Sequence, residues 1–316
     1  MLLAVHFALA LALGIAACGE GGDIGDGGEQ AANRIEKNPD NAGIQITVGS
    51  KNFSEQIILG EIYAQALEAA GYDVEERLNL GSERVALRAL QGGEIDAYPE
   101  YTSTALTSFV GFAPQNVPAD AQRAYEASRP LFERRGLTTF PPTPFSSANA
   151  VGLLTERADE LDVTSVSDLE GLSDQMRLYG SPECRRRVDC LVGLRDNYGL
   201  RFKSFTPVDI DRRYAVLDSG QADLSILFTT DAQLFVSDEY VILEDDRDVL
   251  PAGNVLFVAR GQIVDEAGAD LAEVVESVQH ELTLEVMQEL NARVDIDRQR
   301  PEEVARAYLE EFGFVR

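Results

Sequence analysis

The segment GEIDAYPEYTSTAL, residues 93–106, concentrates side chains that could do chemistry. The ring faces of Tyr98 and Tyr101 could attract a cation, or both rings could pack in the core. Pro99 fixes the backbone between them, so only some of these side chains can face a ligand. By themselves these residues leave both tyrosines open between a pocket and the core. The segment also holds three carboxylates that acid–base catalysis could use, Glu94, Asp96 and Glu100.

Catalysis is not favoured by these residues. Acid–base catalysis needs groups aimed at one point, and carboxylates spaced along a strand and a turn do not converge in this way. Histidine occurs only at His6 and His280, and His280 falls on an amphipathic helix as a surface residue. A zinc site therefore has almost no ligands. We expect a binding protein and not an enzyme, with no metal and no cofactor.

The composition limits the class of partner. The chain has 316 residues, of which 45% are hydrophobic and 26% charged, so it can bury a core, which we expect to be divided between two domains. The formal net charge is -27. Because contacts to phosphates need a basic surface, this charge excludes nucleic acid as a partner.

The N-terminus predicts export and anchoring. Residues 1–18, MLLAVHFALALALGIAAC, form an apolar run that is too short for a comfortable membrane span. Its end, IAAC, resembles a bacterial lipobox, so we expect Cys18 to be lipidated; the alternative is a signal peptide cut nearby. Residues 19–43 are rich in glycine and acidic side chains, which predicts a flexible tether.

Two further cysteines, Cys184 and Cys190, lie close together in SPECRRRVDC. In an oxidising compartment outside the cytoplasm, such a pair favours a disulfide over a metal site. We expect a small local crosslink.

Hydrophobic periodicity predicts the elements that position these residues. In the first half of the chain, strands are expected at 44–50, 73–80 and 94–99, and helices at 52–72, 82–93 and 118–135. This alternation predicts a parallel α/β sheet. A second α/β run starts at Ala150, with helices at 165–172 and 184–200 and strands at 176–180 and 222–231.

Two stretches with proline and glycine, 137–154 and 243–254, predict that the chain crosses twice between two lobes. The first lobe would then comprise residues 44–146 plus 252–316, and the second residues 147–251. This architecture suits a hinged clamp that closes on a ligand in the cleft between the lobes.

Four collinear segments resemble one family of proteins. GSKNFSEQIILGEIYAQALEAAGY, GEIDAYPEYTSTAL, YGSPECRRRVDC and LFTTD are similar to segments of the osmoprotectant-binding subunits of ABC importers, of the glycine betaine and choline type. The similarity runs from about Ile44 to the C-terminus. It implies a two-lobed, class II periplasmic-binding fold that delivers its ligand to a membrane permease.

The resemblance also implies roles for single residues. Family members hold a quaternary ammonium among tyrosine rings, and basic or hydroxyl side chains take a carboxylate when the ligand has one. By motif, Tyr101 is a cage ring and Thr104 its partner hydroxyl, and Lys51 lies in the first loop. The arginine between the two cysteines is Arg187, although Arg185 and Arg186 are close enough to compete for this role.

The sequence departs from the family pattern in the rest of the cage. Ser147 and Asn149 stand where the family carries an acidic or amide residue and then a tyrosine. Asn149 could hydrogen-bond either the ligand or the hinge. Phe228 stands where the family has a tyrosine, so the aromatic ring is kept and the hydroxyl is lost. The alternative is that Phe228 packs in the core. The tyrosine expected near Ala252 is absent, so two of four cage rings, Tyr101 and Phe228, remain.

These features together predict a lipid-anchored, extracytoplasmic monomer. It would capture a quaternary-ammonium or zwitterionic osmolyte, such as glycine betaine, choline, carnitine or proline betaine, and deliver it to an ABC permease. The alternatives are the same fold with a different small zwitterion or anion, and a ligand-sensing module.

Overall fold

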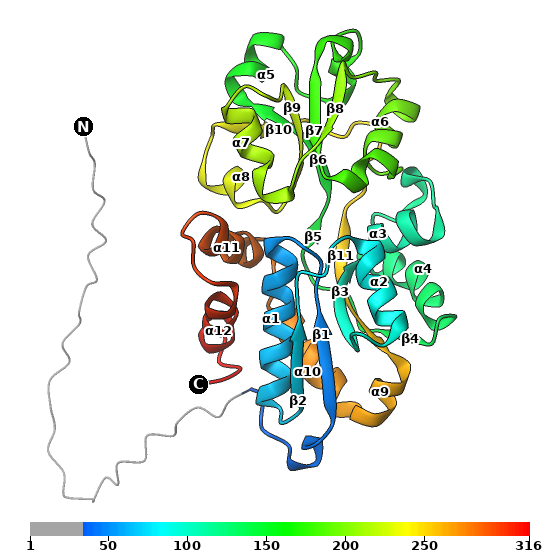
Figure 1. Ribbon diagram of the computed structural model, residues 1–316, viewed down its shortest axis with the longest axis vertical. Coiled ribbons are helices and arrows are strands. Elements are labelled where there is room, and N and C mark those ends of the chain that lie inside the picture. The colour runs from blue at the N-terminus through cyan, green and yellow to red at the C-terminus, as the bar shows by residue number, and fades with distance from the viewer. Residues whose placement is uncertain (1–33) are drawn as a thin grey trace, which may run out of the picture. The chain divides into compact units, whose positions relative to one another are not determined.

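The computed structural model describes residues 34–316 (Figure 1). The signal peptide, the lipidation of Cys18 and most of the tether lie outside these described residues. Within the described part, no helix is long and apolar enough to cross a membrane.

The last ten residues of the predicted tether, 34–43, are folded, so the tether was predicted too long. The backbone N–H of Arg34 donates to the carbonyl of Gly313 at 2.9 Å, and Ile35 is buried in the same core as the first helix. A short 3-10 helix follows at Pro39–Asn41. The many glycine and acidic residues of 19–43 predicted a flexible segment, although Ile35 within it is apolar. Burial of Ile35 stabilises the contact of this segment with the first lobe.

Six strands form the first sheet: β1 (Gln45–Gly49), β2 (Asp73–Arg77), β3 (Ala97–Tyr101), β4 (Leu137–Thr139), β5 (Ser146–Ser147) and β11 (Gly253–Arg260). Their order is β2-β1-β3-β11-β4, with β5 added to β11. The strands β1, β2 and β3 run parallel, as the strand–helix alternation predicts. The strand β11 pairs antiparallel with both β3 and β4, so the sheet is mixed and contains chain from both ends of the fold.

Helices cover both faces of this sheet (Figure 1). They are α1 (Ser54–Ala69), α2 (Glu83–Gly92), α3 (Thr102–Thr104), α4 (Ala121–Glu133), α9 (Gly261–Ala267), α10 (Ala269–His280), α11 (Leu284–Asp295) and α12 (Pro301–Glu311). Helix α1 is buried over most of its length because apolar residues occur all around it. It packs against α10, α11 and α12, which join the C-terminal part of the chain to the first lobe.

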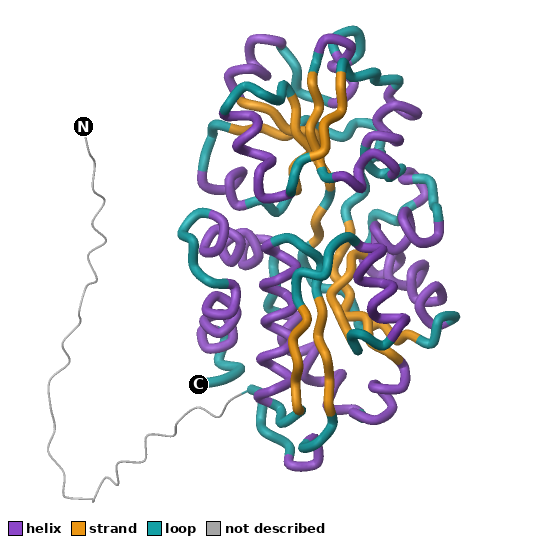
Figure 2. Tube along the Cα trace, in the orientation of Figure 1, coloured by secondary structure: helices purple, strands orange, loops and turns teal. Residues whose placement is uncertain are grey.

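The second sheet contains β6 (Asn149–Leu154), β7 (Arg177–Gly180), β8 (Ser204–Pro207), β9 (Leu224–Phe228) and β10 (Tyr240–Ile242) in the order β10-β6-β9-β7-β8. Its helices are α5 (Thr155–Leu161), α6 (Leu191–Tyr198), α7 (Arg213–Asp218) and α8 (Ala232–Val236). Figure 2 shows the two sheets as separate groups of strands. The two-lobed α/β fold predicted from the sequence is confirmed.

The first crossing between the two sheets is shorter than the sequence indicates. The stretch 137–154, predicted as a crossing, contains β4, β5 and β6, and the chain changes sheet only between Ser147 and Asn149. The helix predicted at 165–172 is reduced to a 3-10 turn at Val166–Leu169. The crossing strands β5 and β11 pair with each other, Ser147 opposite Gly253, so two segments far apart in sequence support one hinge.

The period of strand β3 separates its two tyrosines. Successive side chains of a strand point to opposite faces, so residues three apart face away from each other. Tyr98 is fully buried in the core and donates its hydroxyl to Glu100 at 3.0 Å. Tyr98 is therefore a core residue, and Tyr101 projects from the other face of the sheet.

Candidate functional site

A cavity of about 90 Å³ lies between the two lobes. Both lobes contribute to its wall, and six of its lining residues are those that the sequence predicted as ligand-binding, Lys51, Tyr101, Thr104, Asn149, Arg187 and Phe228. The structure thus brings all six residues together. We call this cavity the cage cavity.

Lys51 lies in the loop between β1 and α1 and is buried. Its Nζ is 2.5 Å from Oε1 of the fully buried Glu100, and it lies 4.3 Å from the ring centroid of Tyr101. Burial lowers the pKa of Lys51, and the Glu100 carboxylate opposes this shift. The predicted carboxylate-binding lysine therefore already has a carboxylate partner within the chain.

Tyr101 is held in place by its hydroxyl. It donates to Oε1 of Glu55 at 2.5 Å, and Nδ2 of Asn291 donates to the other oxygen of this carboxylate at 3.0 Å. Burial raises the pKa of Glu55, and these hydrogen bonds offset only part of the shift. The carboxyl group fixes the orientation of the ring, so that its face can line the cavity.

A third ring, Phe53, was not predicted from the sequence. It precedes α1 and lines the cage cavity between the other two aromatic residues. Its centroid lies 6.4 Å from that of Tyr101, with planes at 18°, and 5.2 Å from that of Phe228. The signal was available, because Phe53 follows Lys51 by two residues in the same loop.

Phe228 ends strand β9, is half-buried and lines the cavity, so it is more than a core ring. The guanidinium of Arg213 stacks on it, with Cζ 4.0 Å from the ring centroid. Asp231 holds this arginine through an ion pair of 2.8 Å. The aspartate of the LFTTD segment therefore acts on the cavity through Arg213.

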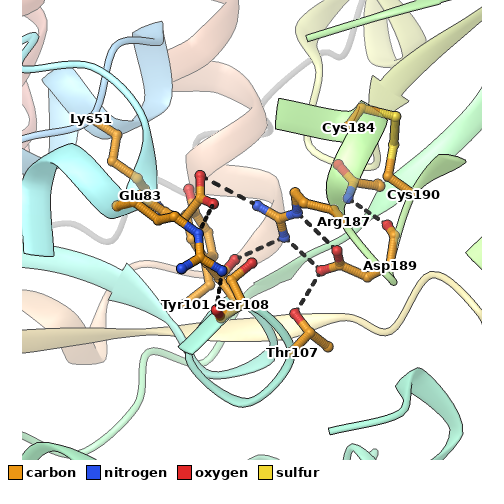
Figure 3. A network of polar contacts seen from close by, with 12 residues as sticks. Lys51, Glu83, Tyr101, Thr107, Ser108, Cys184, Arg187, Asp189 and Cys190 are labelled. Atoms are coloured by element: carbon orange, nitrogen blue, oxygen red, sulfur yellow. Dashed lines mark hydrogen bonds and ion pairs between the residues drawn. A yellow bond between two sulfur atoms is a disulfide. The ribbon is translucent and has the colours of Figure 1, made fainter. Parts of the chain in front are cut away.

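Arg187 bridges the two lobes (Figure 3). Its Nε and Nη2 donate to the two carboxylate oxygens of Asp189 at 2.8 and 2.5 Å. Nη2 also donates to Thr104 at 3.4 Å, and Nη1 lies 3.9 Å from a carboxylate oxygen of Glu83. Burial disfavours the charged form of Arg187, but these two carboxylates outweigh it and raise its pKa.

The other two arginines of the trio point away from the cavity. Arg185 and Arg186 are exposed, and neither lines the cage cavity. The predicted disulfide between Cys184 and Cys190 is present, with the Arg187 segment closed inside its loop. This crosslink restricts the segment and so holds one arginine of the three toward the first lobe.

Asp189 is a second residue that the sequence analysis missed. Besides the two bonds from Arg187, its carboxylate accepts a hydrogen bond from Thr107 of the first lobe at 2.9 Å. Its backbone carbonyl accepts from Nδ2 of Asn149 at 2.9 Å. Asn149 thus lines the cavity and also braces the second lobe.

The charges of the cavity leave an acidic excess. The cations Lys51 and Arg187 are paired with Glu100 and Asp189, and Glu83 adds a further buried carboxylate. Each of these cations already has a carboxylate partner, with which a carboxylate of the ligand would have to share it. A cation would instead meet aromatic faces and surplus negative charge, so the wall is suited to a ligand with a positive group.

The sequence of residues 44–311 matches the protein-family model of the substrate-binding domain of ABC-type glycine betaine transport systems. The chain belongs to this family. The family predicted from the four sequence segments is thus confirmed, and with it a role in solute binding for transport.

Individual relatives support this assignment. A glycine-betaine-binding protein of Pseudomonas aeruginosa is 32% identical over 277 residues, which cover 84% of this chain and 87% of the relative. A Helicobacter pylori ergothioneine transport permease/ergothioneine binding protein is 28% identical over 283 residues, covering 89% of this chain but 49% of that longer protein. A solved structure of a glycine betaine/carnitine/choline ABC transporter protein has a TM-score of 0.67 at 24% identity, covering 85% of this chain and all of the other, so it shows the shared fold.

The buried carboxyl of Glu55 predicts a pH dependence of stability. Its pKa is raised above the ordinary 4.5 in the folded protein, so between 4.5 and the raised value the folded state binds more protons than the unfolded state. The free energy of unfolding therefore falls as the pH rises through this window. We expect Glu55→Gln to make that fall shallower, as measured by urea unfolding at a series of pH values.

A control for this prediction lies on the same helix. Glu68 is exposed, and Glu68→Gln should retain the pH profile of the natural protein. If Glu55→Gln and the natural protein gave parallel profiles above pH 4.5, the carboxyl of Glu55 would not be the source of the dependence.

Proposed function

We propose that the chain is an extracytoplasmic solute-binding protein that captures a quaternary-ammonium osmolyte and delivers it to an ABC permease. Anchoring through lipidated Cys18 and a monomeric state are part of this proposal, and no catalytic step is included. The observation that carries it is the row of rings from Tyr101 through Phe53 to Phe228 on the wall of a cavity with an acidic excess. Such a wall holds a positively charged group without a hydrogen bond.

Recognition is coupled to closure of the lobes. Tyr101 and Phe53 belong to the first lobe and Phe228 to the second, so a cation between these rings joins both lobes. Arg187 and Asp189 of the second lobe meet Thr104 and Thr107 of the first beside the same cavity. A ligand that contacts both lobes stabilises the closed arrangement over an open one. The permease would bind the closed, ligand-loaded form in preference to the open form.

Calorimetric titration of the full chain tests this proposal. The ligands are choline, glycine betaine, carnitine and proline betaine, with a neutral amino acid as the control without a quaternary ammonium. We expect saturable heat from at least one quaternary ammonium compound and none from the amino acid. No heat from any of the four would contradict the proposal and would direct the search toward other zwitterions and anions.

The pairing of Arg187 with Asp189 predicts the order of preference among these ligands. With its guanidinium engaged, Arg187 is a poor partner for a ligand carboxylate, so choline should bind better than glycine betaine. Asp189→Asn releases donors of Arg187, and a charge-assisted hydrogen bond to the ligand then favours glycine betaine. We expect the ratio of the choline Kd to the glycine betaine Kd to rise about tenfold, measured by titration.

The chain offers a matched control for this substitution. Asp196 pairs with Arg195 on the surface at 2.7 Å, with both side chains about half exposed. Asp196→Asn should leave the ratio unchanged. An unchanged ratio in Asp189→Asn as well would mean that the ligand carboxylate does not reach Arg187.

A further inference from the structure

One carboxylate on the wall of the cage cavity has no close partner among the described residues. Glu83 is the first residue of α2, is 5% exposed and lines the cavity. The cations nearest to its two oxygens are Nη1 of Arg187 and Nε of Arg84, each at 3.9 Å (Figure 3). Both distances exceed the length of a hydrogen bond, so the carboxylate can still accept a positive group of a ligand.

Neither arginine neutralises Glu83. The charge of Arg187 is balanced by Asp189, whose carboxylate accepts its two hydrogen bonds of 2.8 and 2.5 Å. The side chain of Arg84 is 63% exposed, and its Nη2 donates to the carbonyl of Ser108 at 2.6 Å. An ion pair with such an exposed partner is weak, because water surrounds the guanidinium. The negative charge of Glu83 therefore remains available to a ligand in the cavity.

The position of Glu83 at the start of a helix does not explain its burial. A carboxylate in the first helical turn is favoured by the helix dipole even without a ligand, and it can have this role while it stays in water. Burial of a charge without a close partner costs free energy. A buried carboxylate on a cavity wall therefore points to a positively charged partner that comes from outside the chain.

Glu83 is also the carboxylate of this wall whose charge is least weakened. The carboxylate of Asp189 lies 2.5 Å from Nη2 of Arg187, so that pair is nearly neutral. Glu183 lines the same cavity but is only half-buried, so water weakens its effect on a ligand. A cation inside the cavity meets Glu83 where little water intervenes, and opposite charges attract more strongly there than in bulk water.

We propose that Glu83 is the counter-ion of the bound ligand and determines specificity for the ligand's net charge. Its carboxylate attracts the ammonium group of choline and of glycine betaine alike. It repels the carboxylate that glycine betaine also carries, so the two effects partly cancel for the zwitterion and not for choline. This inference rests on the proposed function, because it uses the same ammonium group in the cage cavity.

Calorimetric titration of the full chain carrying Glu83→Gln tests it with three probes. They are choline, glycine betaine and the uncharged alcohol in which a carbon atom replaces the nitrogen of choline. We expect the Kd for choline to rise about tenfold or more, and the Kd values for the other two probes to change less than about threefold. Because the uncharged alcohol has the shape of choline, equal changes for these two probes would show altered packing and would overturn the inference.

Three further variants assign the effect to the charge at this position. Glu83→Asp keeps the charge, so it should retain most of the preference for choline over the uncharged alcohol. Glu183→Gln removes the half-buried carboxylate of the same wall and should weaken choline less than Glu83→Gln does. Glu156 is exposed in the first turn of α5 and does not line the cavity, so Glu156→Gln is the matched control for the change in net charge and should leave the Kd for choline unchanged.

The outcomes separate this inference from the proposed function. If a quaternary ammonium compound binds, but choline keeps its affinity in Glu83→Gln or loses as much in Glu183→Gln, only the role of Glu83 is overturned. If no quaternary ammonium compound binds the natural protein, the proposed function fails and the inference fails with it. The effect is also distinct from that of Asp189→Asn, in which glycine betaine gains affinity, whereas in Glu83→Gln choline loses it.

Discussion

Tyr101→Ala should raise the Kd for choline about 30-fold or more. A cation–π contact away from water contributes about 2 kcal/mol or more, and each 1.4 kcal/mol corresponds to a factor of ten in Kd. The ring is buried, and the centroid of its neighbour Phe53 lies 6.4 Å from its own. Calorimetric titration gives the Kd, and circular dichroism establishes that the variant is folded.

Tyr101→Phe is the matched control for this prediction. It keeps the ring and removes only the hydroxyl that donates to Glu55. We expect a loss of affinity much smaller than in Tyr101→Ala, together with a loss of stability of about 1–2 kcal/mol, since a buried carboxyl then lacks one donor. If Tyr101→Ala bound choline within about threefold of the natural protein, the ammonium group would not lie on this ring.

Glu100→Gln should destabilise the protein by about 3–5 kcal/mol at neutral pH. The substitution leaves the ammonium of Lys51 buried without its carboxylate, and an uncompensated buried charge carries a cost of this size. Glu100 also accepts hydrogen bonds from the backbone N–H of Tyr101 and the hydroxyl of Tyr98, which the amide can satisfy only in part. Urea unfolding measures the effect.

A double variant distinguishes a lost charge partner from damaged packing. Lys51→Met combined with Glu100→Gln removes both charges, and much of the lost stability should return, because no uncompensated buried charge remains. Because burial lowers the pKa of Lys51, the loss in the single variant should also shrink as the pH rises and the amine loses its proton. A single variant within about 1 kcal/mol of the natural protein would contradict the picture of an isolated buried pair.

Much of this site could be anticipated along the chain. The alternation of strands and helices, the two lobes and the family follow from local patterns and four motifs. The disulfide joins cysteines six residues apart, so both partners lie within one short segment. Tyr101 was separable from Tyr98 in principle, because a strand places residues three apart on opposite faces.

What the sequence by itself determined is six of the side chains that line the cage cavity, because they lie at the ends of strands or in the loops beside them. Only the tertiary structure decided which of them are free to meet a ligand. Lys51 pairs with Glu100 across 49 residues, Arg187 meets Thr104 across 83, and Asn291 reaches Glu55 across 236. A buried charge pairs with the opposite charge that the fold brings nearest to it. Packing between segments distant in sequence decides which charge that is, so local sequence patterns do not predict it.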